Sequence, residues 1–188
     1  AAFSALFAAD ALTGPQIMTK MDDVLYASKD KDMKLRFTLI EKNGRESARE
    51  MATLEKGPDR RLMKFTSPAD QKGISVLSLP DGSIYLYLPA YKKVKRIASS
   101  VKNTTFAGTD FTYEDMEARR YADSYTAELV RTEAEHWVVQ LTPKPDAASG
   151  SARLLMWVRR DSYVPTIIEY YDAKGVLARR MTSERIEQ

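Results

Sequence analysis

The spacing of apolar residues near the start of the chain predicts a helix. Between residues 15 and 27 the apolar positions recur every three to four residues, as in Ile17, Met21 and Leu25, while polar residues fill the other positions. Pro15 suits the first turn of a helix, where its missing N–H costs nothing, and Thr13 or Gly14 can cap that turn. We therefore expect an amphipathic helix over residues 15–27.

The spacing changes from Met33 onward, where apolar and polar residues alternate as far as Leu39. This alternation predicts a strand with one apolar face. Asn43-Gly44 then favours a tight hairpin, because both central residues of such a turn need a positive φ. Residues 45–55 are consequently expected to form a second strand, although their composition also suits a helix.

Shorter apolar or alternating runs, separated by Gly, Pro, Asp and Ser, predict two further groups of antiparallel strands. The predicted ranges are 60–66, 73–79, 83–88, 91–97, 124–132, 135–142, 152–160, 164–172 and 176–186. Residues 99–120 lose the alternation and are rich in Ser, Thr and Gly before an acidic and aromatic run. We expect a long loop there, with a short helix over 112–119.

Some of these strands are apolar on both faces, which a one-sided sheet does not require. This is the case for residues 84–88, IYLYL, and for residues 154–158, LLMWV. Because the chain offers few helices to cover a second face, the pattern favours a sheet strongly curved around its contents or a closed barrel. A two-layer core without a cavity explains the same residues equally well. The expected fold class is α+β and mainly β.

Composition limits the chemistry that the chain can perform. It has no Cys and a single His, His136, so disulfides and thiolate metal sites are excluded and His-based zinc sites are disfavoured. The 29 Lys and Arg against 26 Asp and Glu leave a net charge of +3, spread along the chain, which by itself indicates no polyanionic partner. With 188 residues, one domain over 13–188 is expected.

The first nine residues, AAFSALFAA, are uncharged and precede Asp10. The run is far shorter than the roughly 20 residues that cross a bilayer. It resembles the end of a secretory signal near a small-residue cleavage site, so residues 1–12 are predicted to be a signal-peptide remnant or a flexible N-terminus of an exported protein. The alternative is the ordinary apolar start of a helix.

No motif predicts catalysis. His136 lies in a predicted strand, and the chain contains no Gly-x-Ser-x-Gly nucleophile motif, so a hydrolase that uses this histidine is the weaker hypothesis. The densest carboxylates do not have the spacing of a calcium loop and are interpreted as capping charges of a short helix. They are Asp110, Glu114, Asp115 and Glu117. We expect no enzyme, no metal site and no cofactor.

Residues 85–96, YLYLPAYKKVKR, interleave aromatic with basic residues. Single-strand nucleic-acid platforms use this mixture, but lysines on a strand are also a routine protection of a sheet edge. The basic excess is not repeated elsewhere, so no nucleic-acid partner is expected. A basic rim beside an aromatic wall equally suits an anionic lipid head group or an acidic protein.

Five short stretches, in a fixed order between about residues 15 and 185, carry a resemblance to a known family. They are SPADQKG at 67–73, YLPAYKKVKRI at 87–97, FAGTDFTYED at 106–115, MWVRRDSYVP at 156–165 and DAKG at 172–175. Together they resemble the outer-membrane lipoprotein-sorting protein family, the LolA-like group of Gram-negative periplasmic proteins, in its uncharacterised branch. The resemblance implies a half-open antiparallel β-barrel with helices as a lid over a hydrophobic cavity for acyl chains, and a link with RND-type exporters.

The predicted faces of the strands nominate the wall of such a cavity. Met and aromatic side chains suit it because they adapt to a flexible acyl chain without demanding one shape. Plain core packing explains the same positions equally well. The candidate lipid-binding residues are Leu35, Phe37, Leu39, Met63, Phe65, Val76, Leu86, Met156, Trp157 and Ile168.

The sequence thus predicts a periplasmic carrier that binds a lipid, a lipoprotein acyl chain or a similar hydrophobic molecule for transfer between membranes. An inner-membrane exporter or an outer-membrane acceptor is the expected partner, with only transient membrane contact. The helix over 15–27 and the segment 99–120 are the expected lid elements, because neither belongs to the sheet. The alternative is a periplasmic sensor or accessory module that binds a protein partner through the same sheet.

Overall fold

The computed structural model describes residues 12–41, 43–106, 111–118, 120–147 and 149–183. One helix of three turns, α1 (Gly14–Leu25), opens this part of the chain, and two groups of strands follow. The predicted signal-peptide remnant at residues 1–12 lies, except for Leu12, outside the described residues, as do Gly108 and Asp110. No helix in the described ranges is both long and apolar enough to span a membrane.

Helix α1 begins where the sequence predicts. The Thr13 side chain accepts a hydrogen bond from the Gln16 backbone N–H, and the Gln16 side chain accepts one from the Thr13 N–H, which forms a complete capping box. Gly14 allows the close approach to the neighbouring sheet, since a Cβ atom there would lie 2.7 Å from the backbone of Glu128 and Leu129. The apolar side of α1 is thereby held directly against a strand.

The first sheet has six antiparallel strands in the order β1-β2-β3-β4-β5-β6. Each strand pairs with the next one along the chain, as expected of a meander. The strands are β1 (Asp30–Ile40), β2 (Glu46–Lys56), β3 (Arg60–Ser67), β4 (Ser75–Ser78), β5 (Ile84–Leu88) and β6 (Lys93–Ile97). The 3₁₀ turn η1 (Pro89–Tyr91) joins the last two.

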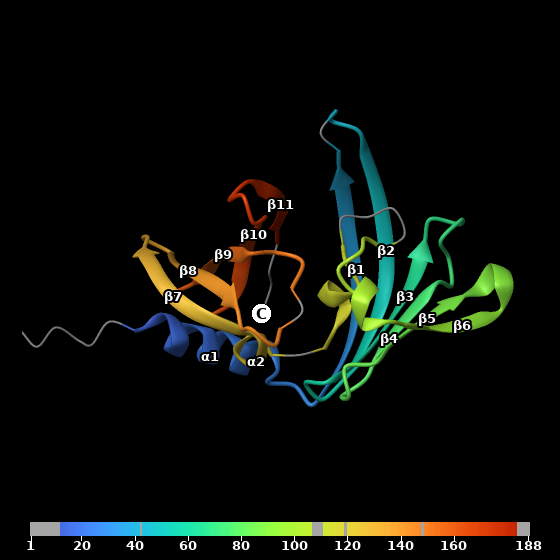
Figure 1. Cartoon of the computed structure of the whole chain (residues 1–188), viewed down its shortest axis with the longest axis horizontal. Helices are drawn as coiled ribbons and strands as arrows, with labels where there is room; N and C mark the ends of the chain where they lie inside the picture. The colour runs from blue at the N-terminus through green and yellow to red at the C-terminus, as the bar shows by residue number, and fades with distance from the viewer. Residues whose placement is uncertain (1–11, 42, 107–110, 119, 148, 184–188) are drawn as a thin grey trace, which may run out of the picture.

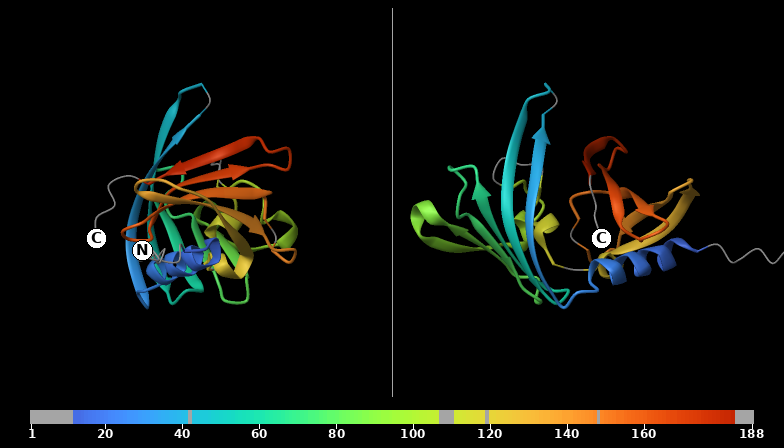
Figure 2. Two further views of the ribbon diagram at one scale, coloured as in Figure 1. Left: turned by 90° about the vertical axis from the view of Figure 1, so that its left-hand side faces the viewer. Right: turned by 180° about the vertical axis from the view of Figure 1, so that it is seen from behind.

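The second sheet has five antiparallel strands in the order β11-β10-β9-β8-β7. Three short helical turns, η2 (Ser99–Val101), η3 (Glu114–Met116) and α2 (Tyr121–Ser124), precede it. Its strands are β7 (Tyr125–Thr132), β8 (His136–Pro143), β9 (Arg153–Arg159), β10 (Pro165–Tyr171) and β11 (Leu177–Thr182). Figure 1 shows α1 running along this second sheet while the first sheet stands apart, and the view from behind in Figure 2 agrees.

Each sheet has its own apolar core on its inner face, the face turned toward the rest of the molecule. The core of the second sheet contains side chains of α1, whereas the core of the first sheet contains side chains of the segment 99–117 that joins the sheets. The buried members of the second core include Ile17, Met21, Val139, Leu141, Leu154, Met156, Val158 and Ile168. Those of the first are Met51, Met63, Phe65, Val76, Ile84, Leu86, Phe106 and Met116.

The mainly β, half-open antiparallel fold is confirmed, and the described strands divide into two sheets instead of closing into a barrel. The second strand predicted over 45–55 is also confirmed, as β2. The short helix predicted over 112–119 is confirmed only in part: the described residues there form the single 3₁₀ turn η3, and a second short helix, α2, begins at Tyr121. The Thr112 and Asp115 side chains each accept a hydrogen bond from the other residue's backbone N–H, as in a capping box, so they start this turn. The turn ends after one step because the backbone is extended at Glu117 (φ −63°, ψ 136°).

Candidate ligand cavity

A cavity of about 510 Å³ lies at the junction of the two sheets. This volume is in the range of small-molecule and cofactor sites. Apolar and aromatic side chains from both sheets and from the ends of α1 and α2 form much of its wall. They are Leu25, Tyr26, Met33, Phe111, Tyr121, Tyr125, Leu154, Tyr170, Ala178 and Met181.

On the side of the first sheet, a buried carboxylate holds two cations at the cavity wall. Glu55 accepts a hydrogen bond from Lys31 Nζ at 2.9 Å and from Arg61 Nε at 2.7 Å. Register explains the cluster, because Lys31 pairs with Glu55 across β1 and β2, and Glu55 pairs with Arg61 across β2 and β3. The three charges share one face of the sheet, where each cation compensates the buried carboxylate.

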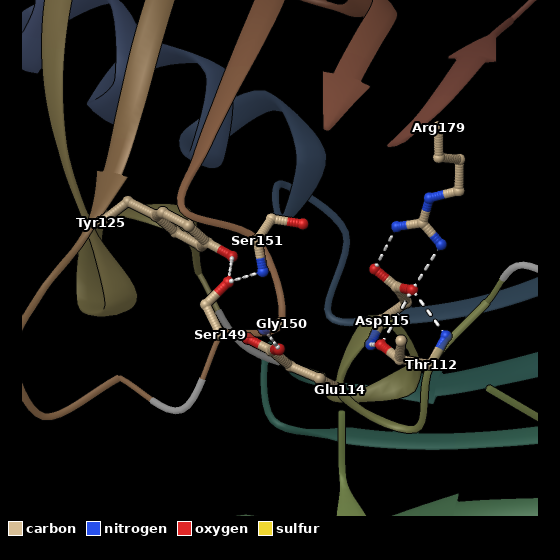
Figure 3. A network of polar contacts seen from close by, with 8 residues as sticks. All are labelled: Thr112, Glu114, Asp115, Tyr125, Ser149, Gly150, Ser151 and Arg179. Carbon is tan, nitrogen blue, oxygen red and sulfur yellow. Dashed lines mark hydrogen bonds and ion pairs between the residues drawn. The ribbon is translucent and has the colours of Figure 1, made fainter. Parts of the chain in front are cut away.

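On the side of the second sheet, Asp115 and Arg179 form a two-pronged ion pair, with N–O distances of 2.7 and 2.9 Å (Figure 3). The guanidinium also stacks on the Tyr170 ring, with 3.8 Å between Cζ and the ring centroid. Asp115 belongs to η3 in the connecting segment and Arg179 to β11. This pair therefore ties the segment between the sheets to the second sheet.

A second contact of the same segment lies beside the first in Figure 3. The Gly150 backbone N–H donates to the Glu114 carboxylate over 3.0 Å. Nearby, the Tyr125 hydroxyl lies 3.4 Å from the Ser149 hydroxyl, which also accepts a hydrogen bond from the Ser151 N–H. The neighbouring carboxylates of η3 thus bind two places on the second sheet: Asp115 binds Arg179 in β11, and Glu114 binds Gly150 in the loop before β9.

Tyrosine hydroxyls give the cavity a polar but uncharged component. Burial raises the pKa of Tyr26, Tyr121 and Tyr170, so these hydroxyls stay protonated at neutral pH. A protonated phenol offers both a donor and an acceptor beside a flat apolar ring. The cavity wall can therefore contact a molecule that has an apolar body and a few polar groups.

Below the tyrosines, Asp22 of α1 fixes the start of α2. Its side chain is 1% exposed and accepts hydrogen bonds from the backbone N–H groups of Tyr121, at 3.0 Å, and Ala122, at 2.8 Å. Burial raises the pKa of the Asp22 carboxyl, although these two N–H donors oppose the rise. The contact aligns the C-terminal part of α1 with Tyr121 and Tyr125 at the cavity.

The structure distributes the ten predicted lipid-binding residues over several places. None of them is among the residues that line the cavity. Leu35 is 42% exposed, and Phe37 and Leu39 are partly buried on the same face of β1. Buried in the first core are Met63, Phe65, Val76 and Leu86; buried in the second are Met156 and Ile168.

Trp157 lies on the face of the second sheet opposite to Met156. Neighbouring residues of a strand point to opposite faces, so the two side chains cannot belong to one wall. Trp157 pairs with Val138 and Ile167 across the sheet, and the Arg131 guanidinium lies 5.5 Å from its ring centroid. Its environment is thus the outer surface of the sheet.

The cavity residues that the sequence analysis missed had partial signals. Met33 and Lys31 belong to the alternating face of β1, and Tyr121 and Tyr125 are four residues apart, as on one side of a helix. Nothing in the local pattern, however, indicates that these two pairs meet. Their meeting depends on the angle between the sheets, which no local spacing encodes.

The residues weighed for catalysis or metal binding have other partners in the structure. His136 Nε2 lies 3.1 Å from the Thr166 hydroxyl, on a strand of the second sheet and away from the cavity lining. Glu117 pairs with Lys102, while Glu114 and Asp115 hold the contacts already described. Among the described residues, no group of three or more His, Cys, Asp or Glu is arranged to hold a metal ion.

Comparison with known proteins places this fold in a family. A family model described as "Uncharacterized protein" matches residues 57–188. A search of curated proteins finds no match. A domain from Vibrio parahaemolyticus, assigned as an outer membrane lipoprotein-sorting protein, is 28% identical with a TM-score of 0.80, over 93% of this chain and 78% of that one.

Two further structures have the same fold. A DUF1329 family protein from Desulfovibrio piger is 27% identical with a TM-score of 0.81, over 93% of this chain and 78% of that one. A LolA superfamily protein from Nitrosomonas europaea is 20% identical with a TM-score of 0.73, over 95% and 80% of the two chains, and shows the fold alone. The resemblance inferred from the sequence is confirmed. The chain belongs to this uncharacterised family, and its fold is that of the LolA-like outer membrane lipoprotein-sorting proteins.

Proposed function

We propose that the protein is an exported, periplasmic carrier that binds a lipid-like molecule in the cavity between the two sheets and releases it to a partner without covalent chemistry. Residues 13–188 would be the single lipid-binding domain and residues 1–12 the remnant of the export signal. The observation that carries the proposal is the 510 Å³ cavity in a lipoprotein-sorting fold, where apolar and aromatic side chains of both sheets lie beside charged residues such as Lys31, Glu55 and Arg179.

The composition of the wall favours an amphiphile over a fully apolar ligand. Met33, Leu154 and Met181 supply flexible or aliphatic contacts, and the tyrosine hydroxyls supply hydrogen bonds. Each buried methylene contributes about 0.8 kcal/mol, so an acyl chain with ten buried methylenes gains on the order of 8 kcal/mol before ordering costs. This gain is enough for stable binding and small enough for transfer to a tighter acceptor.

Release requires the cavity to open, and the best candidate for the moving part is formed by the described residues of the connecting segment, 99–106 and 111–117. The Asp115–Arg179 pair and the Glu114–Gly150 contact hold it to the second sheet. Breaking these few polar contacts would separate the segment from that sheet without unfolding either core. A partner that supplies a competing carboxylate for Arg179 would favour the open form. An inner-membrane exporter or an outer-membrane acceptor would act as donor or recipient.

The experiment is lipid extraction followed by mass spectrometry on protein purified from the periplasm of a Gram-negative host. We expect a lipid or other amphiphile in stoichiometric amount, and uptake of a fluorescent fatty acid by the delipidated protein. Repeated absence of bound lipid together with absence of uptake would reject the carrier. It would favour the alternative, a sensor or accessory module that binds a protein through the same sheet.

Two substitutions on one strand locate the ligand. Met33 and Leu35 lie on the same face of β1, but only Met33 lines the cavity. Met33→Glu should weaken fatty-acid uptake by tenfold or more, because it buries a charge beside the acyl chain. Leu35→Glu, at a position 42% exposed, should leave uptake unchanged. If Leu35→Glu weakens uptake and Met33→Glu does not, the ligand binds near Leu35, and the cavity is not the binding site.

A further inference from the structure

The outer face of the first sheet, opposite to its core, carries a continuous row of apolar side chains. Register places Leu54 opposite Leu62, Leu62 opposite Leu77, and Leu77 opposite Tyr85. These four residues therefore form a row across β2, β3, β4 and β5, with neighbouring strands about 4.8 Å apart. Leu54 is 49% exposed and Leu62 is 37% exposed, while Leu77 and Tyr85 are partly buried, so the half of the row on β2 and β3 is the most open to solvent.

A second row extends the apolar surface toward the edge of the sheet. Tyr87 pairs with Val94 across β5 and β6, and the two side chains are 36% and 64% exposed. We call the six residues of both rows the outer strip: Leu54, Leu62, Leu77, Tyr85, Tyr87 and Val94. In η1, next to the strip in the chain, Tyr91 is 71% exposed. Exposed apolar side chains gathered on one face indicate an interaction site, whereas single ones do not.

Cations border this strip. Lys34 and Lys64 lie in the same transverse row as Tyr87 and Val94, and Arg96 ends the row of Tyr85. All three side chains are exposed. Asp32, opposite Leu54, is the carboxylate at the far end of the first row. The border is therefore predominantly positive.

The outer face of the second sheet has a different arrangement. There the Arg131 guanidinium lies over Trp157, and the Arg153 guanidinium lies 4.0 Å from the centroid of the Tyr171 ring. These cations cover the aromatic rings of their own sheet. In the described part of the chain, Tyr85, Tyr87 and Tyr91 have no such ring or cation contact. Of these three tyrosines, Tyr87 and Tyr91 are exposed and Tyr85 is partly buried, so the first two are accessible to an external partner.

We propose that the outer strip docks the protein on the surface of an anionic lipid bilayer. Leucine and tyrosine side chains enter the boundary between head groups and acyl chains, where tyrosine is favoured because its hydroxyl stays at the polar level. Lys34, Lys64 and Arg96 reach anionic head groups with long stems that lie along the apolar surface. A bilayer matches both features, an apolar strip and a positive border, over a broad sheet face.

This inference goes beyond the carrier function and does not depend on the cavity. In β2, Leu54 of the strip is next to Glu55 of the cavity wall, and in β3, Leu62 of the strip is next to Arg61 of the cavity wall. Because neighbouring residues of a strand point to opposite faces, Glu55 and Arg61 lie on the other face of the sheet. The docking surface and the cavity are therefore back to back across one sheet. Docking through the strip leaves the cavity side free for a ligand or a protein partner.

Vesicle flotation tests the proposal. The full chain is mixed with vesicles of phosphatidylethanolamine and phosphatidylglycerol, or of phosphatidylcholine alone. We expect binding to the anionic vesicles that weakens as salt is raised, and weak binding to the zwitterionic ones. The double substitution Leu54→Ser with Leu62→Ser should lower the anionic-vesicle partition coefficient by tenfold or more. The matched control, Val176→Ser with Leu177→Ser, alters two exposed apolar residues of the β10–β11 hairpin and should bind as the unaltered chain does.

Two variants that each remove one lysine charge test the positive border of the outer strip separately. Lys64→Gln should weaken binding to anionic vesicles about fivefold, since one lysine near such a surface contributes about 1 kcal/mol. Lys72→Gln, at an exposed loop position, should have little effect. Sedimentation velocity on the same variants tests for a dimer through this face, and fatty-acid uptake reports on the cavity.

Each failure has a distinct meaning. No binding of the unaltered chain to anionic vesicles overturns the docking proposal, as does equal loss in the strip and control variants. A strip variant that changes the oligomeric state and not vesicle binding assigns the face to a second copy and also overturns it. Loss of fatty-acid uptake with vesicle binding intact concerns only the carrier proposal.

Discussion

The two sheets are built alike but covered differently on their inner faces. A regular helix covers the second sheet, and Ile17 and Met21 of that helix are 0% and 1% exposed. The first sheet is covered by the segment 99–117, in which Phe106 and Met116 are buried within turns and loops. The helical cover of the second sheet is a permanent part of a core. The cover of the first sheet is an irregular segment, and a few polar contacts help to hold it to the rest of the molecule.

This difference has an energetic reason. A helix satisfies most of its backbone hydrogen bonds internally, and its stability in a protein comes from packing of its apolar face. The irregular segment depends on particular partners, such as the Phe111 carbonyl for the Phe106 N–H and the Lys102 carbonyl for the Glu114 N–H. Segments with such structure belong to the less stable end of the local unfolding range. We therefore expect the described residues of this segment to move more readily than α1 does.

The largest expected effect comes from truncating the helical cover. Ile17→Ala removes a fully buried side chain and should lower the free energy of unfolding by about 4 kcal/mol. Phe106→Ala, in the irregular cover, should lower the free energy of unfolding by only about 1–2 kcal/mol, well below the usual cost of truncating a buried Phe. The loss is limited because it cannot exceed the free energy needed to open this segment locally. Urea unfolding of both variants measures the comparison.

Fatty-acid uptake provides the second readout of this pair. Phe106→Ala should raise the uptake rate, because a segment that is packed less firmly on the first sheet separates more often from the second sheet, while Ile17→Ala should not. If Phe106→Ala costs as much stability as Ile17→Ala, the irregular cover is as integral as the helix, and the comparison between the two sheets fails.

Much of this architecture follows from sequence patterns. The alternation from Met33 to Leu39 predicted β1, Asn43-Gly44 predicted the hairpin, and together they outweighed the helical composition of residues 45–55. These signals are local, since turn geometry and alternating burial act within a few residues. The same holds for α1, where the capping residues and the apolar spacing agree.

The cavity could not be predicted in this way, because it depends on how the two sheets meet. Met156 and Trp157 were both predicted to line the lipid-binding wall, although neighbouring residues of a strand point to opposite faces of the sheet. The prediction also took buried residues such as Phe65 as a wall, when aromatic side chains of the connecting segment fill that place: the Phe65 and Phe106 rings are 5.7 Å apart. Which segment fills a concave face is a tertiary property that no period along the chain records.

The polar anchor of the helical cover gives the next largest effect. Asp22→Ala leaves the N–H groups of Tyr121 and Ala122 without their acceptor in a buried place, which should cost about 3 kcal/mol. Asp23→Ala is the matched control, since this neighbouring carboxylate is 61% exposed and pairs with Arg120 at the surface. It should cost less than about 1 kcal/mol. Equal costs in urea unfolding would show that Asp22 is not the anchor of α1.

A smaller effect is expected at the corresponding contact of the irregular cover. Arg179→Ala removes both hydrogen bonds to Asp115 and should lower the free energy of unfolding by about 2 kcal/mol. It should also speed the release of a bound fluorescent fatty acid severalfold, because the segment is freed from the second sheet. Arg180→Ala is the control: this arginine is 52% exposed and lies 3.8 Å from Glu169. A variant at Arg179 with lower stability but unchanged release would separate this ion pair from cavity opening.

The smallest effect distinguishes the two covers by pH. Because burial raises the pKa of Asp22, the folded protein holds that proton more tightly than the unfolded chain does. The Asp22 contribution to stability is therefore most favourable below the unfolded pKa, near 3.8, and falls as the pH rises through the higher folded pKa. In Asp22→Asn the group no longer titrates, and its amide oxygen can still accept a backbone N–H.

The free energy of unfolding of the unaltered chain minus that of Asp22→Asn should accordingly decrease as the pH rises above about 3.8 and become level once the pH exceeds the folded pKa of Asp22. Subtracting the variant removes the titration of the other carboxylates, which both proteins share. A difference that increases with pH would mean that the Tyr121 and Ala122 N–H groups stabilise the carboxylate more than burial penalises it. Asp22 would then anchor α1 as a charge, and the helical cover would resemble the irregular one in depending on an ionised carboxylate.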